Sequence, residues 1–393
     1  SEAATLAYMG LYAQQHRGQE GAGVVSSDGI SLYRHMGQGL VSDVFSDSNV
    51  FDVLLGDSAI GHVRYSTTGN SDPKNVGPLT FNMGDHSLSI AHNGNLVNID
   101  KIRSELQEDG ALFQTSTDTE IIIPLIAREK GKNLAEKVEK ALQKIEGAYS
   151  LLLLSPNEII AARDPHGIRP FCMGKLQDTI VFASETCALD LLGAEYLQDV
   201  FPGEMIVAND DGFYSKTIIN PQESKHCIFE FIYFSRPDSK IFGQNVDKMR
   251  REFGRKLAQE SPSDTGDIVI SVPDSSNTCA LGFSSKSGVK HEIGLIRNHY
   301  VGRTFIFPSQ RLRDLSVRLK FNTVKGVMQD KEVVIIDDSI VRGTTLKKLT
   351  KLIRESGAKK VHVRISSPPV RHPCFYGMDF PTTEELIAGK KEI

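Results

Sequence analysis

The sequence lacks the features that would place it in a membrane, in an oxidising compartment or on nucleic acid. No apolar run approaches the roughly 18 residues of a membrane-spanning helix, and the longest, such as Leu151 to Leu154, suit buried strands. Five scattered cysteines without a CxxC pair argue against a disulfide framework and favour a reducing cytoplasm. A net charge of -4 gives no basic footprint for nucleic acid. We therefore expect a cytoplasmic protein with neither a membrane nor a nucleic acid as partner.

What remains is the composition of an ordinary globular protein. Its 393 residues are 40% hydrophobic and 24% charged, and this length suggests two domains. Before about residue 220, short apolar strands alternate with helices and Gly-rich turns, which predicts an α+β sandwich. Beyond it, strands and helices alternate, as in a parallel, doubly wound α/β sheet. We therefore predict one domain over residues 1–222 and a second over residues 223–393.

Apolar periodicity predicts the individual elements, beginning with a helix in the first stretch of the chain. The strands expected in the first domain are Ala59 to Tyr65, Ser87 to Ala91, Tyr149 to Leu154, Glu158 to Ala162 and Thr179 to Ala183. The helices expected there are Ile99 to Gln107, Asp118 to Arg128 and Asn133 to Lys144. The second domain is expected to hold helices at Val246 to Glu260, from Thr278 and at Thr345 to Ser356, with strands at Ile268 to Val272, Glu332 to Ile336 and Lys360 to Ile365.

One segment of the second domain carries the strongest chemical signal. It reads VVIIDDSIVRGTT and runs from Val333 to Thr345. A buried strand would deliver Asp337 and Asp338 to its carboxyl end, where open α/β sheets bind ligands. Adjacent carboxylates suit a vicinal diol and Mg²⁺, while the hydroxyls, the glycine and the helix N-terminus that follow suit a phosphate. The segment predicts a sugar-phosphate site; the alternative is an acidic turn that caps a helix with Thr345.

This segment resembles the 5-phosphoribosyl-1-pyrophosphate (PRPP) signature of type I phosphoribosyltransferases. DDSIVRGTT is similar to the version in the glutamine PRPP amidotransferase (amidophosphoribosyltransferase) family, and the likeness covers essentially the whole chain. The neighbouring segments that resemble this family are YFSRPDS (233–239), VPDSS (272–276), YVGRTFI (300–306), SSPP (366–369) and HPCFYG (372–377).

The resemblance implies roles for particular residues of this site. Asp337 and Asp338 would bind the ribose hydroxyls and Mg²⁺, with Ser275 of the pyrophosphate loop near the metal. The residues implied to cradle the 5-phosphate are Ser339, Arg342, Gly343, Thr344 and Thr345. Residues 297–310 resemble a flexible loop that closes over PRPP, where Arg303 would add positive charge to the pyrophosphate. The family often has Lys-Asn-Arg where this sequence has Arg297, Asn298 and His299, so one basic contact departs from the pattern.

Four polar, Gly-rich strings mark the first domain, and we interpret them as turns among its strands. They are QHRGQEGAG (15–23), GHVRYSTTG (61–69), AHNGNLVN (91–98) and TSTDTE (115–120). Turn chemistry alone would account for them, yet they hold what a free amino acid needs. Arg64 can take an α-carboxylate and Asp118 can pair with an α-ammonium group. Asn93 and the Gly94 N–H can form an oxyanion hole.

The four strings together resemble class II glutamine amidotransferases, the N-terminal-nucleophile group. The resemblance implies that Arg64 and Asp118 bind glutamine, that Asn93 and Gly94 stabilise the oxyanion, and that Arg17 supports the site. It also implies an N-terminal cysteine nucleophile that opens a buried strand. Ser1 heads a helix and is rejected for this role, so we expect that strand upstream and helical segments after Ile393. The prediction is that the chain as printed does not hydrolyse glutamine.

Cysteine positions raise a cofactor hypothesis. Cys227 and Cys374 match two of the four thiolates that bind a [4Fe–4S] cluster in some members of the family. The alternative is that both are small buried hydrophobic residues, as we expect for Cys172, Cys187 and Cys279.

The sequence as a whole resembles a two-domain enzyme of purine synthesis. Glutamine would be hydrolysed in the first domain, and the ammonia would pass internally and attack C1 of PRPP, giving 5-phosphoribosylamine and pyrophosphate. The resemblance also implies Mg²⁺, feedback by purine nucleotides and a homo-oligomer, either dimer or tetramer. A glucosamine-6-phosphate synthase type shares the first domain but would not carry DDSIVRGTT. A PRPP-sensing regulatory protein without turnover stays open as the alternative.

Overall fold

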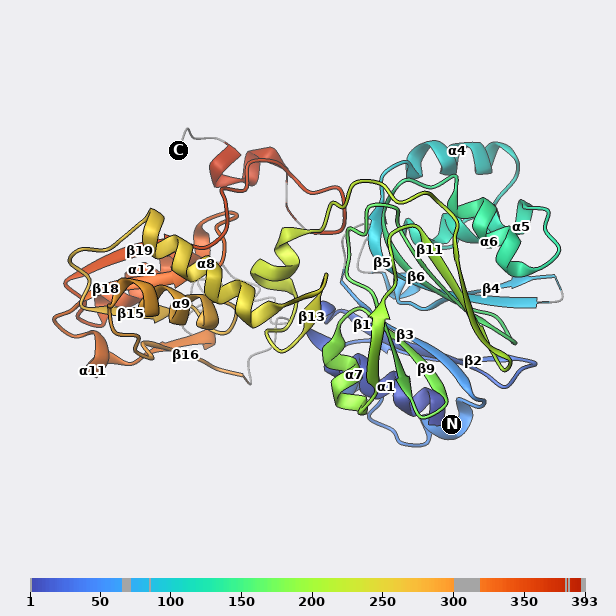
Figure 1. The fold of residues 1–393 in the computed structure, drawn as a ribbon, viewed down its shortest axis with the longest axis horizontal. Coiled ribbons are helices and arrows are strands. Elements are labelled where there is room, and N and C mark those ends of the chain that lie inside the picture. Colours follow the sequence, from blue (N-terminus) through green and yellow to red (C-terminus); the bar gives the residue numbers. More distant parts are fainter. Residues whose placement is uncertain are drawn as a thin grey trace. The chain divides into compact units, whose positions relative to one another are not determined.

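The computed structural model describes residues 2–65, 72–84, 86–299, 319–378, 380 and 382–389 (Figure 1). It divides into two compact units. The first comprises Ser1–Cys227, Ser239–Gly243 and Cys374–Asp379, and the second comprises Ile228–Asp238, Gln244–Pro373 and Phe380–Ile393. Across these described ranges, no helix has the length and apolar character to cross a membrane.

The first unit contains two three-stranded antiparallel sheets. One has the order β2-β1-β3 and the other the order β10-β8-β9, so β3 and β9 are edge strands among the described elements. The strands are β1 (Gly21–Ser27), β2 (Leu32–Gln38), β3 (Ser58–Arg64), β8 (Cys172–Leu176), β9 (Thr179–Ala183) and β10 (Glu195–Asp199). Strand β1 is buried along its whole length, which places this sheet inside the unit.

A six-stranded antiparallel sheet forms the other layer, in the order β12-β11-β7-β6-β5-β4. Its strands are β4 (Leu79–Met83), β5 (His86–Leu96), β6 (Gly147–Leu154), β7 (Ile159–Arg163), β11 (Glu204–Asn209) and β12 (Gly212–Thr217). Strand β5 is the longest and pairs with β6 from Ser89 to Leu96. It lies between β6 and β4, and its polar end belongs to the candidate site described below.

Helices lie on the two outer sides of this sandwich. Helices α1 (Glu2–Ala13) and α7 (Thr186–Leu192) lie beside β3 and β9, whereas α4 (Ile99–Glu108), α5 (Ile122–Arg128) and α6 (Leu134–Leu142) pack on the six-stranded sheet (Figure 1). Their apolar residues recur at helical spacing and are buried against that sheet. The short elements are η1 (Gln15–Arg17), α2 (Val41–Val44), α3 (Val50–Val53), η2 (Pro73–Asn75) and η3 (Thr119–Ile121).

The second unit is built on a parallel sheet with the order β15-β18-β19. Strand β18 (Glu332–Asp337) lies between β15 (Ile268–Ser271) and β19 (Lys360–Ile365). Val333 and Ile335 face a cluster with α12 (Thr344–Glu355), and Val334 and Ile336 face a cluster with α9 (Asn277–Ser287). Because both faces are covered, the middle of the central strand, residues 333–336, is a continuous apolar run, as is typical of parallel sheets.

The structure describes further elements after β12. They are η4 (Glu230–Phe234), β13 (Lys240–Ile241), β14 (Gln244–Asn245), α8 (Val246–Glu260), β16 (Leu295–Arg297), β17 (Phe321–Thr323), α11 (Lys325–Met328), η5 (Thr383–Glu385) and η6 (Ile387–Gly389). The predicted fold class, an N-terminal-nucleophile α+β sandwich followed by a doubly wound type I phosphoribosyltransferase domain, is confirmed.

Most predicted elements are present, but the interpretation of the Gly-rich strings as turns is wrong for three of the four. Residues 21–23 begin β1, residues 61–64 end β3, and residues 91–96 end β5. Their glycines serve close backbone approach rather than chain reversal. A Cβ atom on Gly23 would lie 2.5 Å from the Gly77 carbonyl oxygen, and one on Gly94 would lie 2.0 Å from that of Ala148. Residues 115–120 form a turn that leads into η3.

Candidate active sites

Arg64 is the last residue of β3, and its guanidinium is buried. One terminal nitrogen donates to the Asn75 carbonyl oxygen at 2.7 Å, and Nε lies 4.0 Å from a Glu20 carboxylate oxygen. Burial lowers the pKa of Arg64 from its ordinary value, while the carboxylates of Glu20 and Asp118 act in the opposite direction. The strand therefore ends in a fixed, buried cation, which suits a carboxylate ligand.

Asn75 connects Arg64 to the turn that carries Asp118. Its amide nitrogen donates to Ser116 Oγ at 3.0 Å, and its amide oxygen accepts from the Ser116 N–H at 3.2 Å. The buried Asp118 carboxylate accepts from the Leu96 N–H at 2.9 Å and lies 3.6 Å from His92 Nδ1. The ends of β3 and β5 and the turn at 115–118 therefore form one polar network around the predicted glutamine residues.

Asn93 and Gly94 lie near the end of β5. The Asn93 amide nitrogen donates to Ser184 Oγ at 3.4 Å, and Gly94 has φ of +150°. Asn93 lines a cavity of about 80 Å³ together with His62, Ser150 and Ser184. Burial lowers the pKa of His62 to about 4, so the ring is neutral at physiological pH. His62 Nδ1 and Ser150 Oγ are buried, and neither has a hydrogen-bond partner among the described atoms.

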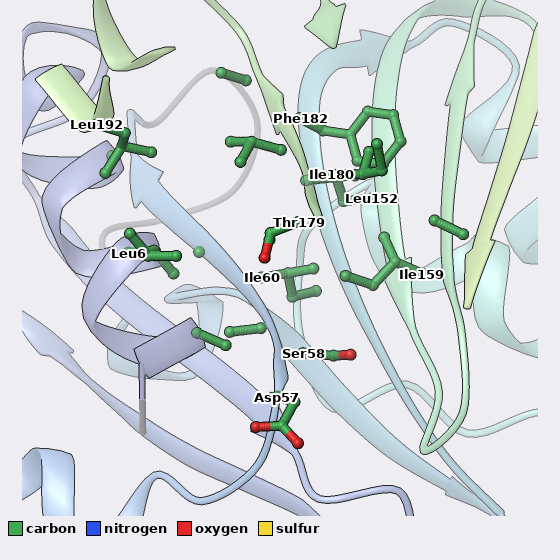
Figure 2. Close-up of a pocket in the computed structure, with 18 of the residues that line it drawn as sticks. Leu6, Asp57, Ser58, Ile60, Leu152, Ile159, Thr179, Ile180, Phe182 and Leu192 are labelled. Carbon is green, nitrogen blue, oxygen red and sulfur yellow. The ribbon is translucent and has the colours of Figure 1, made fainter. Parts of the chain in front are cut away.

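A larger cavity of about 400 Å³ adjoins this small one and shares Gln14, Gly61 and Phe182 with it. Figure 2 shows Leu6 and Leu192 on one side of it and Leu152, Ile159 and Phe182 on the other. The two edge strands both contribute to its wall, β3 through residues 58–61 and β9 through residues 179–183. The cavity is thus an apolar slot between two sheet edges that leads to the polar end at Asn93.

Arg17 ends the turn η1 and is buried. Its terminal nitrogen donates to a carboxylate oxygen of Glu185, which also lies 2.6 Å from His16 Nε2. Five residues of this site were not predicted from the sequence: Glu185, His62, His92, Asn75 and Ser116. His92 lies inside the string AHNGNLVN (91–98). The only sequence signal for the buried Glu185 is its place between a strand and a helix.

The second site lies at the carboxyl ends of β15, β18 and β19, as the sequence predicts for a parallel sheet. Asp337 and Asp338 are both buried there. Asp338 accepts from the hydroxyls of Ser275 and Ser339, both at 2.5 Å, and Asp337 accepts from the Asp338 N–H at 2.9 Å and from Ser276 Oγ at 3.4 Å. The structure therefore brings the predicted metal-site residues Ser275, Asp337 and Asp338 together.

Burial is the main cause that raises the pKa of both carboxyl groups. For Asp337 the neighbouring charge of Asp338 adds to the effect, whereas hydroxyl hydrogen bonds from Ser275 and Ser339 oppose it at Asp338. Two adjacent carboxylates held out of water favour a proton, a cation or a hydroxyl donor between them. This electrostatic state suits a ligand that brings a diol and Mg²⁺, since Mg²⁺ binds to one or two carboxylates plus phosphate oxygens.

The loop after β18 turns into helix α12 through Gly343. This residue has φ of +73°, a left-handed conformation that favours glycine, and it is the N-cap of the helix. Thr344 and Thr345 form the first turn, where free N–H groups favour a phosphate. The alternative in which Thr345 caps the helix is therefore wrong. Arg342 forms an exposed ion pair with Glu385 at 2.6 Å.

Other predicted residues lie elsewhere. Arg303 lies outside the described residues. Arg297 at the end of β16 pairs with Asp274 of the VPDSS loop at 2.5 Å, and the Pro273–Asp274 peptide bond is cis. Cys227 and Cys374 are both half-buried. Within the described ranges there is no group of three or more His, Cys, Asp or Glu side chains able to hold a metal ion, so these cysteines do not form a four-thiolate set.

Fold and sites together define a class of protein: a glutamine amidotransferase sandwich followed by a type I phosphoribosyltransferase domain. A family model described as a glutamine amidotransferase domain matches residues 62–191. The amidophosphoribosyltransferase of Bacillus subtilis (strain 168) is 49% identical over 393 residues, which is 100% of this chain and 82% of that protein. Amidophosphoribosyltransferase 2, chloroplastic, of Arabidopsis thaliana is 51% identical over 396 residues, covering 100% of this chain and 70% of that protein.

Solved structures agree. The glutamine PRPP amidotransferase from B. subtilis complexed with ADP and GMP has a TM-score of 0.93 at 48% identity, covering 99% of this chain and 84% of that chain. A structure described as the allosteric regulatory enzyme of purine biosynthesis has a TM-score of 0.94 at 48% identity, covering 100% of this chain and 84% of that chain. The chain belongs to the amidophosphoribosyltransferase family.

Proposed function

We propose that this protein transfers ammonia derived from glutamine to C1 of PRPP, giving 5-phosphoribosylamine, pyrophosphate and glutamate, as a step of purine synthesis. The observation that carries the proposal is the buried pair Asp337 and Asp338 at the carboxyl end of a parallel sheet, directly before a phosphate-binding helix N-terminus. We assign the glutaminase half to residues 1–222 and the transferase half to residues 223–393.

In the transferase half, each loop at the sheet edge has a separate task. Asp337 and Asp338 accept hydrogen bonds from the two ribose hydroxyls, which orients the ring. Ser339, Arg342, Gly343, Thr344 and Thr345 bind the 5-phosphate through N–H groups, hydroxyls and the Arg342 cation. The VPDSS loop faces the leaving pyrophosphate, and Mg²⁺ would be held by the two carboxylates, with Ser275 beside it. When bound, the metal supplies positive charge to the leaving group.

Arg303 extends this assignment to the segment YVGRTFI, which lies outside the described residues. Ammonia attacks C1 as the bond to pyrophosphate breaks, and positive charge builds on the ribose ring while negative charge builds on the leaving group. A guanidinium near the pyrophosphate stabilises that negative charge. We therefore propose Arg303 as a catalytic residue, because residues 297–310 resemble the family's loop that closes over PRPP.

The glutaminase half is proposed to bind one glutamine molecule at the network of strand ends. Arg64 binds its α-carboxylate and Asp118 its α-ammonium group, with Arg17 supporting the site. The Asn93 amide nitrogen and the Gly94 N–H would donate to the oxyanion that forms on the side-chain carbonyl. The neutral state of His62 suits this role, since an extra fixed cation beside the oxyanion hole would bind anions without a substrate.

We further propose that a β-strand beginning with the nucleophilic cysteine occupies the apolar slot between β3 and β9. Two sheet edges that pair with no other described strand line the slot, and an inserted strand would join the two three-stranded sheets through main-chain hydrogen bonds. One end of such a strand would reach the small cavity beside Asn93. A strand placed there supplies the thiol nucleophile and its α-amine as base.

This part of the proposal is tested with a synthetic peptide. A peptide of about ten apolar residues that begins with cysteine is added to the protein, and glutamate release from glutamine is measured. Activity with this peptide, and none with the same peptide beginning with serine, supports the strand. Tight binding of the peptide without any glutamate release contradicts the assignment of the oxyanion hole to Asn93 and Gly94.

The central experiment measures pyrophosphate release from PRPP with ammonium chloride and Mg²⁺. We expect turnover by the unmodified chain and at least a hundredfold loss in Asp338→Asn, because a charged contact to the ribose and metal is removed. Binding of PRPP without pyrophosphate release would favour the regulatory alternative and overturn the proposed activity.

The remaining assignments rest on the resemblance and on relatives. The B. subtilis structure is described with ADP and GMP, so we propose inhibition by purine nucleotides, tested by their effect on pyrophosphate release. A homo-oligomer, dimer or tetramer, is tested by light scattering.

A [4Fe–4S] cluster on Cys227 and Cys374 needs two further thiolates, and iron and sulfide analysis of anaerobically purified protein tests it. Five scattered cysteines without a CxxC pair suit a reducing cytoplasm, which fractionation tests.

A further inference from the structure

The carboxylate of Glu185 is contacted from two segments that are distant from it in the sequence, residues 16–17 and Ser239. The side chain is fully buried, at 0% exposure. One oxygen lies within hydrogen-bond distance of His16 Nε2 (2.6 Å) and Arg17 (2.5 Å), and the other accepts from Ser239 Oγ at 2.7 Å. Burial would raise the pKa of Glu185, but Arg17, His16 and Ser239 together hold it well below its usual range, so the group is ionised.

Local helix stability does not account for this carboxylate. Glu185 occupies the N-cap position of α7, where an acidic side chain usually accepts from the first helical N–H groups. Its side chain makes no such hydrogen bond. The carboxylate is directed instead towards the turn η1, about 170 residues earlier in the chain, as its contacts with His16 and Arg17 show. The carboxylate of Glu185 therefore positions residues of η1, which are distant in the sequence, and does not cap helix α7.

The turn held by Glu185 lies directly on the backbone of Arg64. A Cβ atom on Gly18, the residue after η1, would lie 2.5 Å from the Arg64 carbonyl oxygen. The Glu20 N–H donates to that same oxygen at 3.2 Å. A shift of the turn by a fraction of an ångström therefore moves the end of β3, where the guanidinium for the α-carboxylate is located.

Glu185 also controls the other end of the glutamine site through its neighbour. Ser184 Oγ accepts from the Asn93 amide nitrogen at 3.4 Å, and the Ser184 N–H donates to Gln14 at 3.1 Å. Gln14 is the residue before η1, so the second of these contacts returns to the same turn. The residue pair 184–185 thus joins the proposed oxyanion-hole residue to the proposed carboxylate-binding residue.

We infer that Glu185 is a positioning residue for glutamine, which fixes the spacing between Arg64 and Asn93 by holding the turn Gln15–Arg17 through its buried carboxylate. This inference rests on the proposed glutamine site. Ser239, from a segment far along the sequence, donates to the second carboxylate oxygen, and the Cys187 thiol donates weakly to the same oxygen at 3.9 Å. Glu185 itself contacts no substrate, and its effect is on affinity and alignment.

The test is calorimetric titration of glutamine into the full chain and into Glu185→Gln, His16→Gln and Ser239→Ala. Ser27→Ala is the matched control, since Ser27 is also buried and its hydroxyl donates to the Pro156 carbonyl oxygen and accepts from the Gly29 N–H, bonds that the substitution removes. It pairs with Ser58 at the end of the sheet opposite to Arg64. We expect the dissociation constant for glutamine to rise about tenfold or more in Glu185→Gln and about threefold in the two donor variants, with stoichiometry near one.

The stoichiometry separates positioning from folding. A merely structural role would lower the fraction of binding-competent protein and leave the dissociation constant unchanged, and this result would overturn the inference. If Glu185→Gln does not fold, His16→Gln and Ser239→Ala decide the question by the same readout. Pyrophosphate release with ammonia should be unchanged in all four variants. Failure of the unmodified chain to bind glutamine would instead refute the proposed glutamine site.

Discussion

Replacing Asp337 by asparagine should stabilise the protein without substrate while weakening its binding of Mg²⁺ and PRPP. Burial and then the Asp338 carboxylate raise the pKa of Asp337 from its ordinary value of 3.8 to about 7. A carboxyl group whose pKa is raised by folding stabilises the fold at low pH, and this contribution is lost as the pH rises through about 4 to about 7. The loss amounts to at most about 4 kcal/mol at pH 8.

An asparagine at this position cannot ionise, and its side-chain oxygen can still accept the hydrogen bond from the Asp338 N–H. We therefore expect Asp337→Asn to exceed the unmodified protein in free energy of unfolding by about 2 to 4 kcal/mol at pH 8 and by at most about 1.6 kcal/mol at pH 5. Urea unfolding from pH 5 to pH 8, followed by circular dichroism, measures this difference. Calorimetry of Mg²⁺ with PRPP at pH 8 should show binding weakened at least tenfold.

Asp267→Asn is the matched control. Asp267 precedes β15 at the opposite end of the same sheet, where its carboxylate accepts from the Glu332 N–H at 2.8 Å. It should give no stability gain that grows with pH. If Asp337→Asn is less stable than the unmodified protein at pH 8, or if the difference is the same at every pH, then the two carboxylates are not held together at an electrostatic cost.

Three further substitutions probe the two sites. Arg64→Lys should weaken glutamine binding in calorimetry by about tenfold or more, because an ammonium group cannot bind a carboxylate bidentately; equal affinity would exclude Arg64 as the ligand. Gly94→Ala should lower the melting temperature markedly, since its Cβ would lie 2.0 Å from the Ala148 carbonyl oxygen, and an unchanged melting curve would contradict the strand pairing. Gly343→Ala should lose about 1 to 2 kcal/mol of stability in urea unfolding and weaken PRPP binding, because its φ of +73° is left-handed; unchanged affinity would exclude the phosphate role.

The second unit could be predicted closely from the sequence because its signals are local. The strand Lys360–Ile365 and the helix Val246–Glu260 have the predicted bounds. The face that this helix buries most deeply was not predicted, however. The spacing of Met249, Phe253 and Leu257 favoured an apolar stripe, yet Arg250, Gly254 and Ala258 are among its buried residues.

Close helix contact explains this difference. A Cβ atom on Gly254 would lie 1.9 Å from the Cys279 carbonyl oxygen, and one on Gly282 would lie 2.1 Å from that of Arg251. Helices α8 and α9 therefore approach through paired glycines, which a hydrophobic pattern cannot detect because the residues that matter have no side chain. The same reasoning applies to the glycines of β1 and β5, which resemble turn residues in the sequence and lie in strands because a neighbouring backbone approaches them closely.

The two candidate sites also differ in how far local sequence predicts them. Asp337 and Asp338 are adjacent in sequence and follow one buried strand, so a short string was enough to predict that they act together. The glutamine site is assembled from four separate strings, and the residue that joins them, Glu185, belongs to none. Its function depends on a carboxylate that contacts a turn distant in sequence, which composition and periodicity do not encode. Residues that bind ligand were therefore predictable from motifs, whereas a residue that positions them became visible only in the hydrogen bonds of the folded chain.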